Sequence, residues 1–207
     1  MTLNEITTII AGRFGKELDM QYRQWLVPQI NAWRSRLIRN TLQKNPQDKS
    51  RFMQTIQIPL TYGDYTCDVL DCQGSVSDEL PEVVRIGDTP FEYLGGADLK
   101  SPYRFDDVGT SPWIGRGMTA HMFHTYLLDN NRIIIPGERI GKVVATAIFD
   151  QPDQAMQWQC NKAGIGCDWW NAPYPISGDI QTDLTIALQN GLGQPKEILP
   201  AKTDQDE

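Results

Sequence analysis

The chain has 207 residues, of which 40% are hydrophobic and 22% charged, ordinary values for a folded globular protein that exclude global disorder. Its formal net charge of −7 argues against a protein dedicated to coating DNA. The charge is nevertheless uneven. Residues 1–51 carry nine Lys or Arg against four Asp or Glu, a net of +5, whereas residues 52–207 carry ten against twenty-two, a net of −12. A basic end and an acidic end suit stacking against copies of the same chain or against partners.

Residues 1–51 are predicted to be the helical N-terminal part of the chain. Thr2 and Glu5 have the spacing of a capping box, and apolar residues follow at helical intervals. A second helical stretch contains Pro28, which either kinks one helix or begins another, because proline cannot donate the intrahelical hydrogen bond. The segment "QKNPQDKS" is expected to end this helix, since the residue before Pro46 disfavours helical backbone angles.

From about residue 52 the hydrophobic period changes, and residues 52–174 are predicted to form an antiparallel β-rich domain. The segment "FMQTIQIPLT" alternates apolar and polar side chains, as a half-buried strand does. "MFHTYLLDNNRIIIPG" is the clearest hairpin, because Asp129, Asn130 and Asn131 tolerate the left-handed backbone of a tight turn. "KVVATAIF" is the last expected strand, and residues 151–173 are expected to be a loop.

Residues 175–193 are predicted to form a C-terminal helix, followed by a polar tail at residues 194–207. Ser177 or Asp179 is its expected N-cap, and Gly191 lies where a C-cap belongs. We expect this helix to return to the N-terminal helices. The predicted fold is therefore α+β, in which the N- and C-terminal helices form a small bundle and the antiparallel β-rich domain is inserted between them.

The sequence offers little material for catalysis. It contains only two histidines, His121 and His124, and on a strand their spacing places them on opposite faces, where they would not bind one metal. The glycine-containing segment "WIGRGMTA" lacks the known phosphate-binding patterns. We therefore expect no catalytic residue, no cofactor and no metal, and we expect that the protein is not an enzyme.

Four cysteines form two spaced pairs, Cys67 with Cys72 and Cys160 with Cys167. Neither pair has the two-residue spacing of a zinc knuckle. Reduced or merely packed thiols are favoured because we expect synthesis in a reducing cytoplasm, and zinc ligation and disulfides are the alternatives. That compartment is expected because no apolar run approaches the roughly 18 residues of a membrane span, and because "MTLNEITTII" lacks the features of a signal peptide.

The stretch "NAWRSRLIRN" carries Arg34, Arg36 and Arg39 in an otherwise acidic chain. On a helix, Arg34 and Arg39 are separated by a rotation of about 140°, so the arginines flank the apolar stripe and do not form one basic ridge. A helix that binds nucleic acid would usually align more cations along one face. We therefore predict that Arg34, Arg36 and Arg39 contact acidic groups of a neighbouring protein, and nucleic acid is the alternative partner.

Several short motifs follow one another in a distinctive order: "MTLNEI", "RSRLIRN", "YLLDNNRIIIP", "VVATAIFDQP" and "CDWWNAPYPISGDI". Together they are spread over most of residues 1–190. In this order they resemble the virion neck proteins of crAss-like tailed phages. These proteins are ring or head–tail connector components between the portal and the tail, and they are similar in plan to podovirus tail-tube adaptors.

The resemblance implies a structural virion protein of the neck or tail, made in the cytoplasm of the host bacterium. It implies a ring of about twelve copies that binds the portal protein and other neck and tail proteins. Viral double-stranded DNA would pass through its channel without specific binding. It also implies no catalytic residue and a helical bundle core that contains Trp33, Leu37, Leu184 and Leu188. The alternative function is a nucleic-acid-binding accessory module that uses the basic N-terminal helices.

Overall fold

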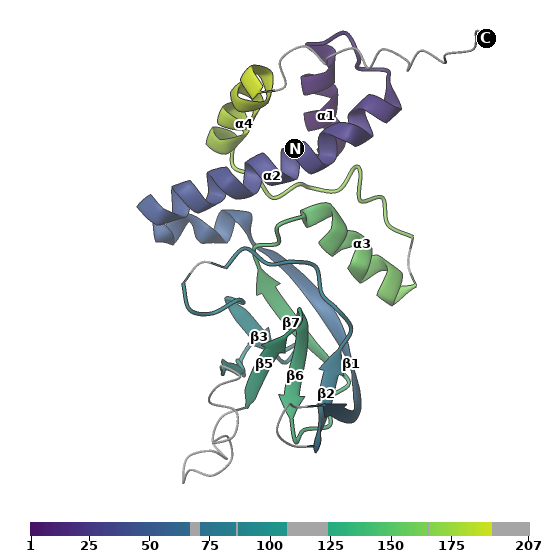
Figure 1. Ribbon diagram of the computed structural model, residues 1–207, viewed down its shortest axis with the longest axis vertical. Coiled ribbons are helices and arrows are strands. Elements are labelled where there is room, and N and C mark those ends of the chain that lie inside the picture. The colour runs from purple at the N-terminus through teal and green to yellow at the C-terminus, as the bar shows by residue number, and fades with distance from the viewer. Residues whose placement is uncertain (67–70, 86, 107–123, 165, 192–207) are drawn as a thin grey trace, which may run out of the picture.

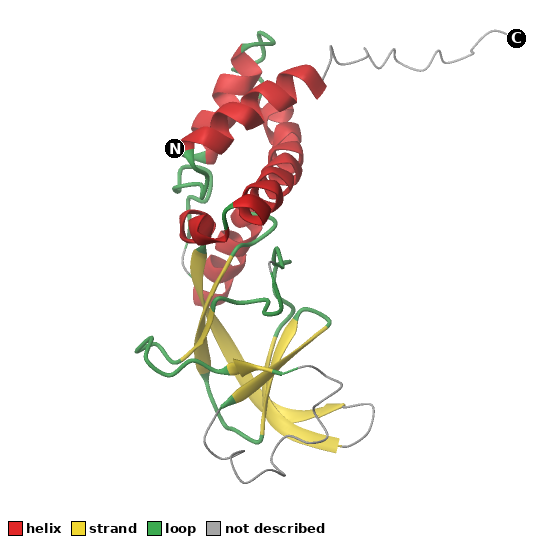
Figure 2. Cartoon of the chain, turned by 90° about the vertical axis from the view of Figure 1, so that its left-hand side faces the viewer, coloured by secondary structure: helices red, strands yellow, loops and turns green. Residues whose placement is uncertain are grey.

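The structure is a computed structural model that describes residues 1–66, 71–85, 87–106, 124–164 and 166–191. These residues form five helices and one mixed sheet of seven strands, so the predicted α+β class is confirmed. The molecule is elongated. Helices α1, α2 and α4 lie at one end and the sheet at the other, with α3 beside the sheet (Figure 1), and the side view shows the same separation (Figure 2).

Helix α1 (Leu3–Gly12) begins at the predicted capping box. The Thr2 hydroxyl accepts a hydrogen bond from the Glu5 backbone N–H, and the Glu5 carboxylate accepts one from the Thr2 N–H. Because both orphan donors are satisfied reciprocally, the helix has a defined start. Its buried residues, Leu3, Ile6, Thr7, Ile10 and Ala11, follow the three- and four-residue spacing of one helical face.

Helix α2 (Met20–Lys44) is the longest helix of the described chain. The Asp19 carboxylate caps its N-terminus by accepting a hydrogen bond from the Tyr22 N–H. Pro28 lies inside the helix, so the helix continues through it and does not restart there. Helix α2 ends at Lys44, within the predicted stop "QKNPQDKS", and a short 3₁₀ helix, η1 (Pro46–Phe52), leads into the sheet.

Helix α4 (Gly178–Gly191) packs on α2, and α1 contacts both. One apolar cluster joins the three helices, with Leu184 and Leu188 fully buried in it and Trp33 and Leu37 partly buried at its margin. Burial of a leucine side chain contributes roughly 1.5–3 kcal/mol, so this cluster is a principal source of stability at the helical end. Its other buried members are Leu3, Ile6, Ile10, Ala11, Leu26, Val27, Ile30 and Tyr174.

The sheet has the strand order β3-β7-β1-β2-β6-β5-β4. Strand β1 alternates as predicted, with Ile56, Ile58 and Leu60 buried in the sheet's core. Its first half pairs with β7 and its second half with β2. The strands are β1 (Gln54–Thr66), β2 (Asp71–Ser77), β3 (Tyr93–Gly95), β4 (Arg104–Phe105), β5 (Thr125–Asp129), β6 (Arg132–Pro136) and β7 (Lys142–Ala147).

The predicted hairpin is confirmed as strands β5 and β6, which pair in an antiparallel register. Its two turn residues, Asn130 and Asn131, have positive φ angles of 46° and 58°. Asparagine adopts this left-handed region more readily than most residues, and two such residues in succession give the twist that a two-residue hairpin needs. The sequence signal for this hairpin was therefore a property of the turn itself.

The prediction of a purely antiparallel β domain is wrong in one respect, because β4 pairs with β5 in parallel. The segment that contains β4 hydrogen-bonds to strands on both sides. The Tyr103 N–H donates to the Leu94 carbonyl at 2.6 Å, and the Arg104 N–H donates to the His124 carbonyl at 2.8 Å. This one segment therefore nearly closes the sheet and covers the exposed backbone of its short edge strands.

Gly95 on β3 permits that near-closure. A Cβ atom at this position would lie 2.3 Å from the Ser101 carbonyl oxygen and 2.7 Å from the Tyr93 hydroxyl oxygen. Both distances are shorter than a van der Waals contact, and the first involves backbone that cannot turn aside. Glycine is therefore required at Gly95 by the close approach of two chain segments.

The expectation of a loop over residues 151–173 is wrong, because helix α3 (Pro152–Ala163) occupies about half of it. Proline at the first helical position and Gly164, with φ of 64°, at the C-cap mark its two ends. Only Ala155 and Trp158 pack against the sheet's core, so the apolar pattern is too sparse to show helical periodicity.

Candidate functional site

Arg34 is completely buried, so the prediction that it contacts a neighbouring protein is wrong. Its guanidinium donates hydrogen bonds from Nε to the Pro175 carbonyl at 2.8 Å, from Nη1 to the Phe149 carbonyl at 3.0 Å and from Nη2 to the Phe52 carbonyl at 3.3 Å. These acceptors belong to three chain segments that lie far apart in the sequence. Arg34 therefore joins α2 to the end of η1, the end of the sheet and the segment before α4.

The sequence contains a signal for this burial. Arg34 lies four residues after Ile30 and four before Ile38, and both isoleucines are fully buried. Positions four apart lie on one helical face, so the arginine is on the apolar stripe itself. Sequence reasoning missed it because a buried arginine is rare unless its charge is paired or its donors are satisfied.

The charge of Arg34 is compensated by its surroundings. Burial lowers the pKa of the guanidinium, and the nearby Tyr174, Asp150 and Asp153 partly oppose that shift. The guanidinium also lies over the Tyr174 ring, 5.5 Å from its centroid. Carbonyl dipoles, two carboxylates and an aromatic face thus replace the water that this cation has lost.

A second set of buried hydrogen bonds adjoins Arg34. The Tyr174 hydroxyl donates to Asn31 Oδ1 at 2.6 Å, and Asn31 Nδ2 donates to Asp153 Oδ1 at 2.7 Å. The Ser35 hydroxyl donates to the Asp150 carbonyl at 3.1 Å. Burial raises the pKa of Tyr174 well above its ordinary value, so its hydroxyl remains a donor into the alkaline range. We call Arg34 together with this set of hydrogen bonds the junction.

Arg36 and Arg39 are exposed. The Arg36 guanidinium lies over the Trp33 ring, 5.2 Å from its centroid. Arg39 Nη2 lies 3.6 Å from Asp150 Oδ1, and the Arg39 side chain keeps 54% of its surface exposed. The structure therefore places two of the three predicted arginines where a partner could reach them.

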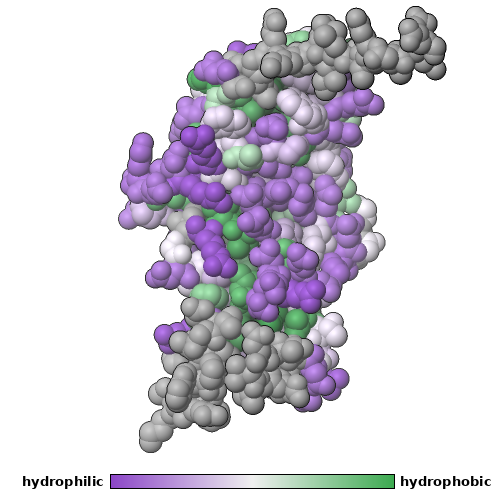
Figure 3. Space-filling view, in the orientation of Figure 1, coloured by the Kyte–Doolittle hydropathy of each residue, from purple (hydrophilic) through white to green (hydrophobic). Residues whose placement is uncertain are grey.

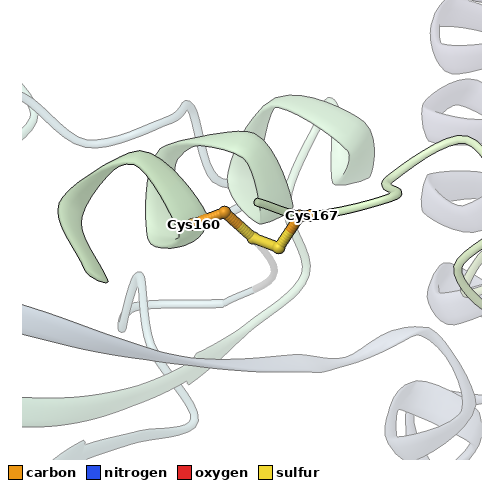
Figure 4. Close-up of a disulfide and its surroundings, with 2 residues drawn as sticks. All are labelled: Cys160 and Cys167. Carbon is orange, nitrogen blue, oxygen red and sulfur yellow. A yellow bond between two sulfur atoms is a disulfide. The ribbon is translucent and has the colours of Figure 1, made fainter. Parts of the chain in front are cut away.

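The four cysteines were predicted to be reduced or packed thiols. Cys160 in α3 and Cys167 form a disulfide, with their Cα atoms 5.8 Å apart, so the prediction of reduced thiols is wrong for this pair (Figure 4). The bond ties the last turn of α3 to the segment that leads toward the junction. Cys67 and the side chain of Cys72 lie outside the described residues.

His124 contacts a carboxylate at the exposed side of the sheet. Its Nδ1 lies 2.7 Å from Glu138 Oε1, and its ring packs near that of Tyr103, 5.2 Å between centroids. His121 lies outside the described residues. Within the described ranges, no group of three or more His, Cys, Asp or Glu side chains is arranged to hold a metal ion.

A concave surface with a volume of about 710 Å³ lies on the sheet. Three carboxylates line it: Asp64 on β1, Asp78 after β2 and Asp129 at the end of β5. We call this surface the acidic concavity. Arg132 also lines it, and Lys162 forms an ion pair with Asp78. Asp64 and Asp129 have no ion-pair partner among the described residues, so the concavity keeps a negative charge.

The surface of the helical end is largely polar on the side shown in Figure 3, whereas hydrophobic residues gather over the sheet.

No protein-family model matches the sequence, and no curated protein matches it. Across the parts of the chain that the structure describes, no helix combines the length and apolar character that crossing a bilayer requires.

Proposed function

We propose that this protein is a structural component of a phage virion, a ring in the neck or tail that connects the portal to the tail and continues the DNA channel. The observation that carries the proposal is that three of the motifs behind the resemblance meet at Arg34. Arg34 belongs to "RSRLIRN", and it binds the Phe149 carbonyl of "VVATAIFDQP" and the Pro175 carbonyl of "CDWWNAPYPISGDI". These motifs together build one buried feature, which supports a likeness of architecture.

The proposed architecture is a bundle of α1, α2 and α4 with the sheet inserted between α2 and α4 in the sequence. A ring component must hold its contacts above, below and beside itself in fixed relative positions. The junction supports this role, because a buried arginine with three carbonyl partners fixes the helical end relative to the sheet. The bundle core would then be the apolar cluster that contains Trp33, Leu37, Leu184 and Leu188.

The proposed ring acts by assembly and uses no cofactor. Its partners would be further copies of the chain, the portal protein and other neck and tail proteins. Viral DNA would pass through without specific binding, which suits a chain with a net charge of −7. The location would be the virion, after synthesis in the cytoplasm of the host.

The first test is to incubate the purified full chain with portal rings of the same phage and to count bound copies by native mass spectrometry. We expect saturation at about twelve copies, because a closed ring matches the symmetry of the ring that it joins. Binding of a single copy, or none, would overturn the proposal.

A nucleic-acid-binding module is the second candidate function. The observation that favours it is that α2 contains no Asp or Glu in its 25 residues. If the candidate is correct, affinity for duplex DNA must fall linearly with the logarithm of the salt concentration, with a slope set by the phosphates contacted. Absence of measurable binding near physiological salt would remove it.

A further inference from the structure

We propose that the exposed face of α2 docks on the acidic concavity of a second copy of this chain. By the α2 face we mean Trp25, Pro28, Ala32, Arg36 and Arg39, all of which are exposed. The inference rests on the proposed function, since it assigns the surfaces through which neighbouring copies in the ring would meet.

The α2 face is a continuous stripe along one helix. Trp25, Ala32 and Arg39 are seven residues apart, which leaves them within about 20° of each other per step on the helix surface. Pro28 and Arg36 fill the intervals. The opposite side of α2 is occupied by the helical cluster and the junction, so this stripe lies on the side of α2 that its own chain leaves exposed.

The chemistry of the α2 face suits a protein partner. Trp25 is 47% exposed and stacks on Tyr22, with ring centroids 5.5 Å apart, so it presents a fixed aromatic surface. Arg36 is similarly supported by Trp33. Tryptophan and arginine dominate the energetics of protein interfaces, and side chains held in place before binding lose less entropy on binding.

Charge complementarity identifies the occupant as a second copy. The α2 face carries two arginines on a helix without a carboxylate, and the acidic concavity carries Asp64 and Asp129 without ion-pair partners in the described chain. Because α2 is fixed by the junction in its own chain, its outer face can meet an acidic concavity only on another copy. Such a contact joins two different surfaces, so it repeats from copy to copy and closes into a ring if the rotation allows.

Duplex DNA is a weaker match for the same face. Phosphate binding draws its affinity from the number of cations that contact the backbone. The α2 face offers two, and Arg39 already lies 3.6 Å from Asp150 in its own chain. Two arginines that enter a concave acidic surface are better satisfied, because each guanidinium can bind a carboxylate with two parallel hydrogen bonds.

The test uses two charge-reversed full-length variants, Arg36→Glu/Arg39→Glu and Asp64→Arg/Asp129→Arg. Self-association is measured by native mass spectrometry and sedimentation velocity, alone and on portal rings. Each variant by itself should associate at least about tenfold more weakly than the wild type, because like charges then face each other. An equimolar mixture should regain association and contain equal numbers of the two variants, since each supplies the charge that the other has lost.

The matched control is Arg85→Glu/Arg104→Glu, which reverses two exposed arginines away from both surfaces and changes the net charge by the same amount as Arg36→Glu/Arg39→Glu. It should associate like the wild type. If the two charge-reversed variants also associate like the wild type, the assigned surfaces are wrong and the proposed ring stands. If the wild type remains a single copy alone and on portal rings, the ring itself fails, and this inference fails with it.

A further outcome distinguishes a second copy of the chain from duplex DNA as the partner of the α2 face. If Arg36→Glu/Arg39→Glu loses binding to duplex DNA at physiological salt but keeps its self-association, the α2 face binds phosphates. That result would overturn the docking of copies and support the nucleic-acid module.

Discussion

Arg34 and Arg36 lie two residues apart on α2, yet the first is completely buried and the second is exposed. Two helical residues span a rotation of about 200°, which places them on opposite faces of the helix. On the inner face, Arg34 donates hydrogen bonds to three backbone carbonyls, those of Phe149 and Phe52 in buried surroundings. On the outer face, Arg36 rests on Trp33 and remains available to a partner. One helix therefore holds the chain together with one face and offers contacts with the other.

The largest expected effect is that of Arg34→Met, which keeps an unbranched apolar stem and removes the hydrogen-bond donors. Each buried acceptor left without a partner costs about 1–3 kcal/mol, so we expect the free energy of unfolding to fall by at least about 3 kcal/mol. Urea unfolding followed by circular dichroism and tryptophan fluorescence measures the change.

Arg36→Met is the matched control on the outer face. It removes an exposed cation–π contact and should cost no more than about 1 kcal/mol. Arg34→Lys should fall between them, because lysine keeps the charge but cannot present the planar fork that reaches three carbonyls. Equal losses at Arg34 and Arg36 would contradict the distinction between the two faces.

The disulfide should have the next largest effect. Cys160→Ser/Cys167→Ser releases a loop whose ends are seven residues apart, and the entropy gained by the unfolded chain corresponds to about 2 kcal/mol. The segment after Cys167 carries Tyr174 and Pro175 to the junction, so this bond supports the inner face. Wild-type protein in reducing buffer should match the variant. If the oxidised wild type and the variant unfold alike, the bond contributes nothing to the junction.

Tyr174→Phe probes the junction through pH. At neutral pH it removes one buried hydrogen bond to Asn31 and should cost about 1 kcal/mol. Because the folded pKa of Tyr174 is raised above its ordinary value of 10.0, the unfolded chain loses this proton first as pH rises. The associated stability is therefore present below pH 10 and is lost progressively above it.

The difference in the free energy of unfolding between the wild type and Tyr174→Phe should accordingly become smaller as unfolding is measured from pH 9 to pH 11. Burial also raises the pKa of Tyr126, so the Tyr174→Phe variant still loses some stability at alkaline pH. If the difference in the free energy of unfolding stays constant with pH, the Tyr174 hydroxyl has the same pKa in the folded and unfolded states.

Local signals predicted the parts of the fold that are determined locally. The capping box at Thr2 and the paired asparagines at Asn130 and Asn131 each specify their own backbone geometry, and both are found where expected. Helix α3 was missed because only Ala155 and Trp158 pack on the sheet's core, although Pro152 and Gly164 marked its ends. Strand β4 has only two residues, and they pair in parallel with β5. A two-residue strand is too short to show a hydrophobic periodicity that would predict this pairing.

The arginines show the same limit at the candidate site. Composition and spacing found Arg36 and Arg39, and their exposure agrees with the predicted role. For Arg34 the spacing from Ile30 and Ile38 indicated burial, but its acceptors lie 18, 115 and 141 residues away in the sequence. Whether a buried cation is tolerated depends on those distant carbonyls, so only the folded chain could reveal it.

The smallest expected effect on stability is that of Arg39→Ala. This variant tests whether Arg39, on the outer face of α2, is available to a partner. The contact with Asp150 is long, at 3.6 Å, and more than half of the arginine side chain is exposed, so solvent screens the pair. Exposed ion pairs of this kind contribute about 0–1 kcal/mol, and we expect a loss near the lower end that disappears in high salt. The matched partner is Asp150→Asn, and the double variant separates the pair's own contribution from the field that Asp150 exerts on Arg34. A large loss for Arg39→Ala would mean that Arg39 belongs to the junction and is already committed within its own chain. A negligible loss of stability, combined with weakened association, would locate the role of Arg39 in the contact between copies.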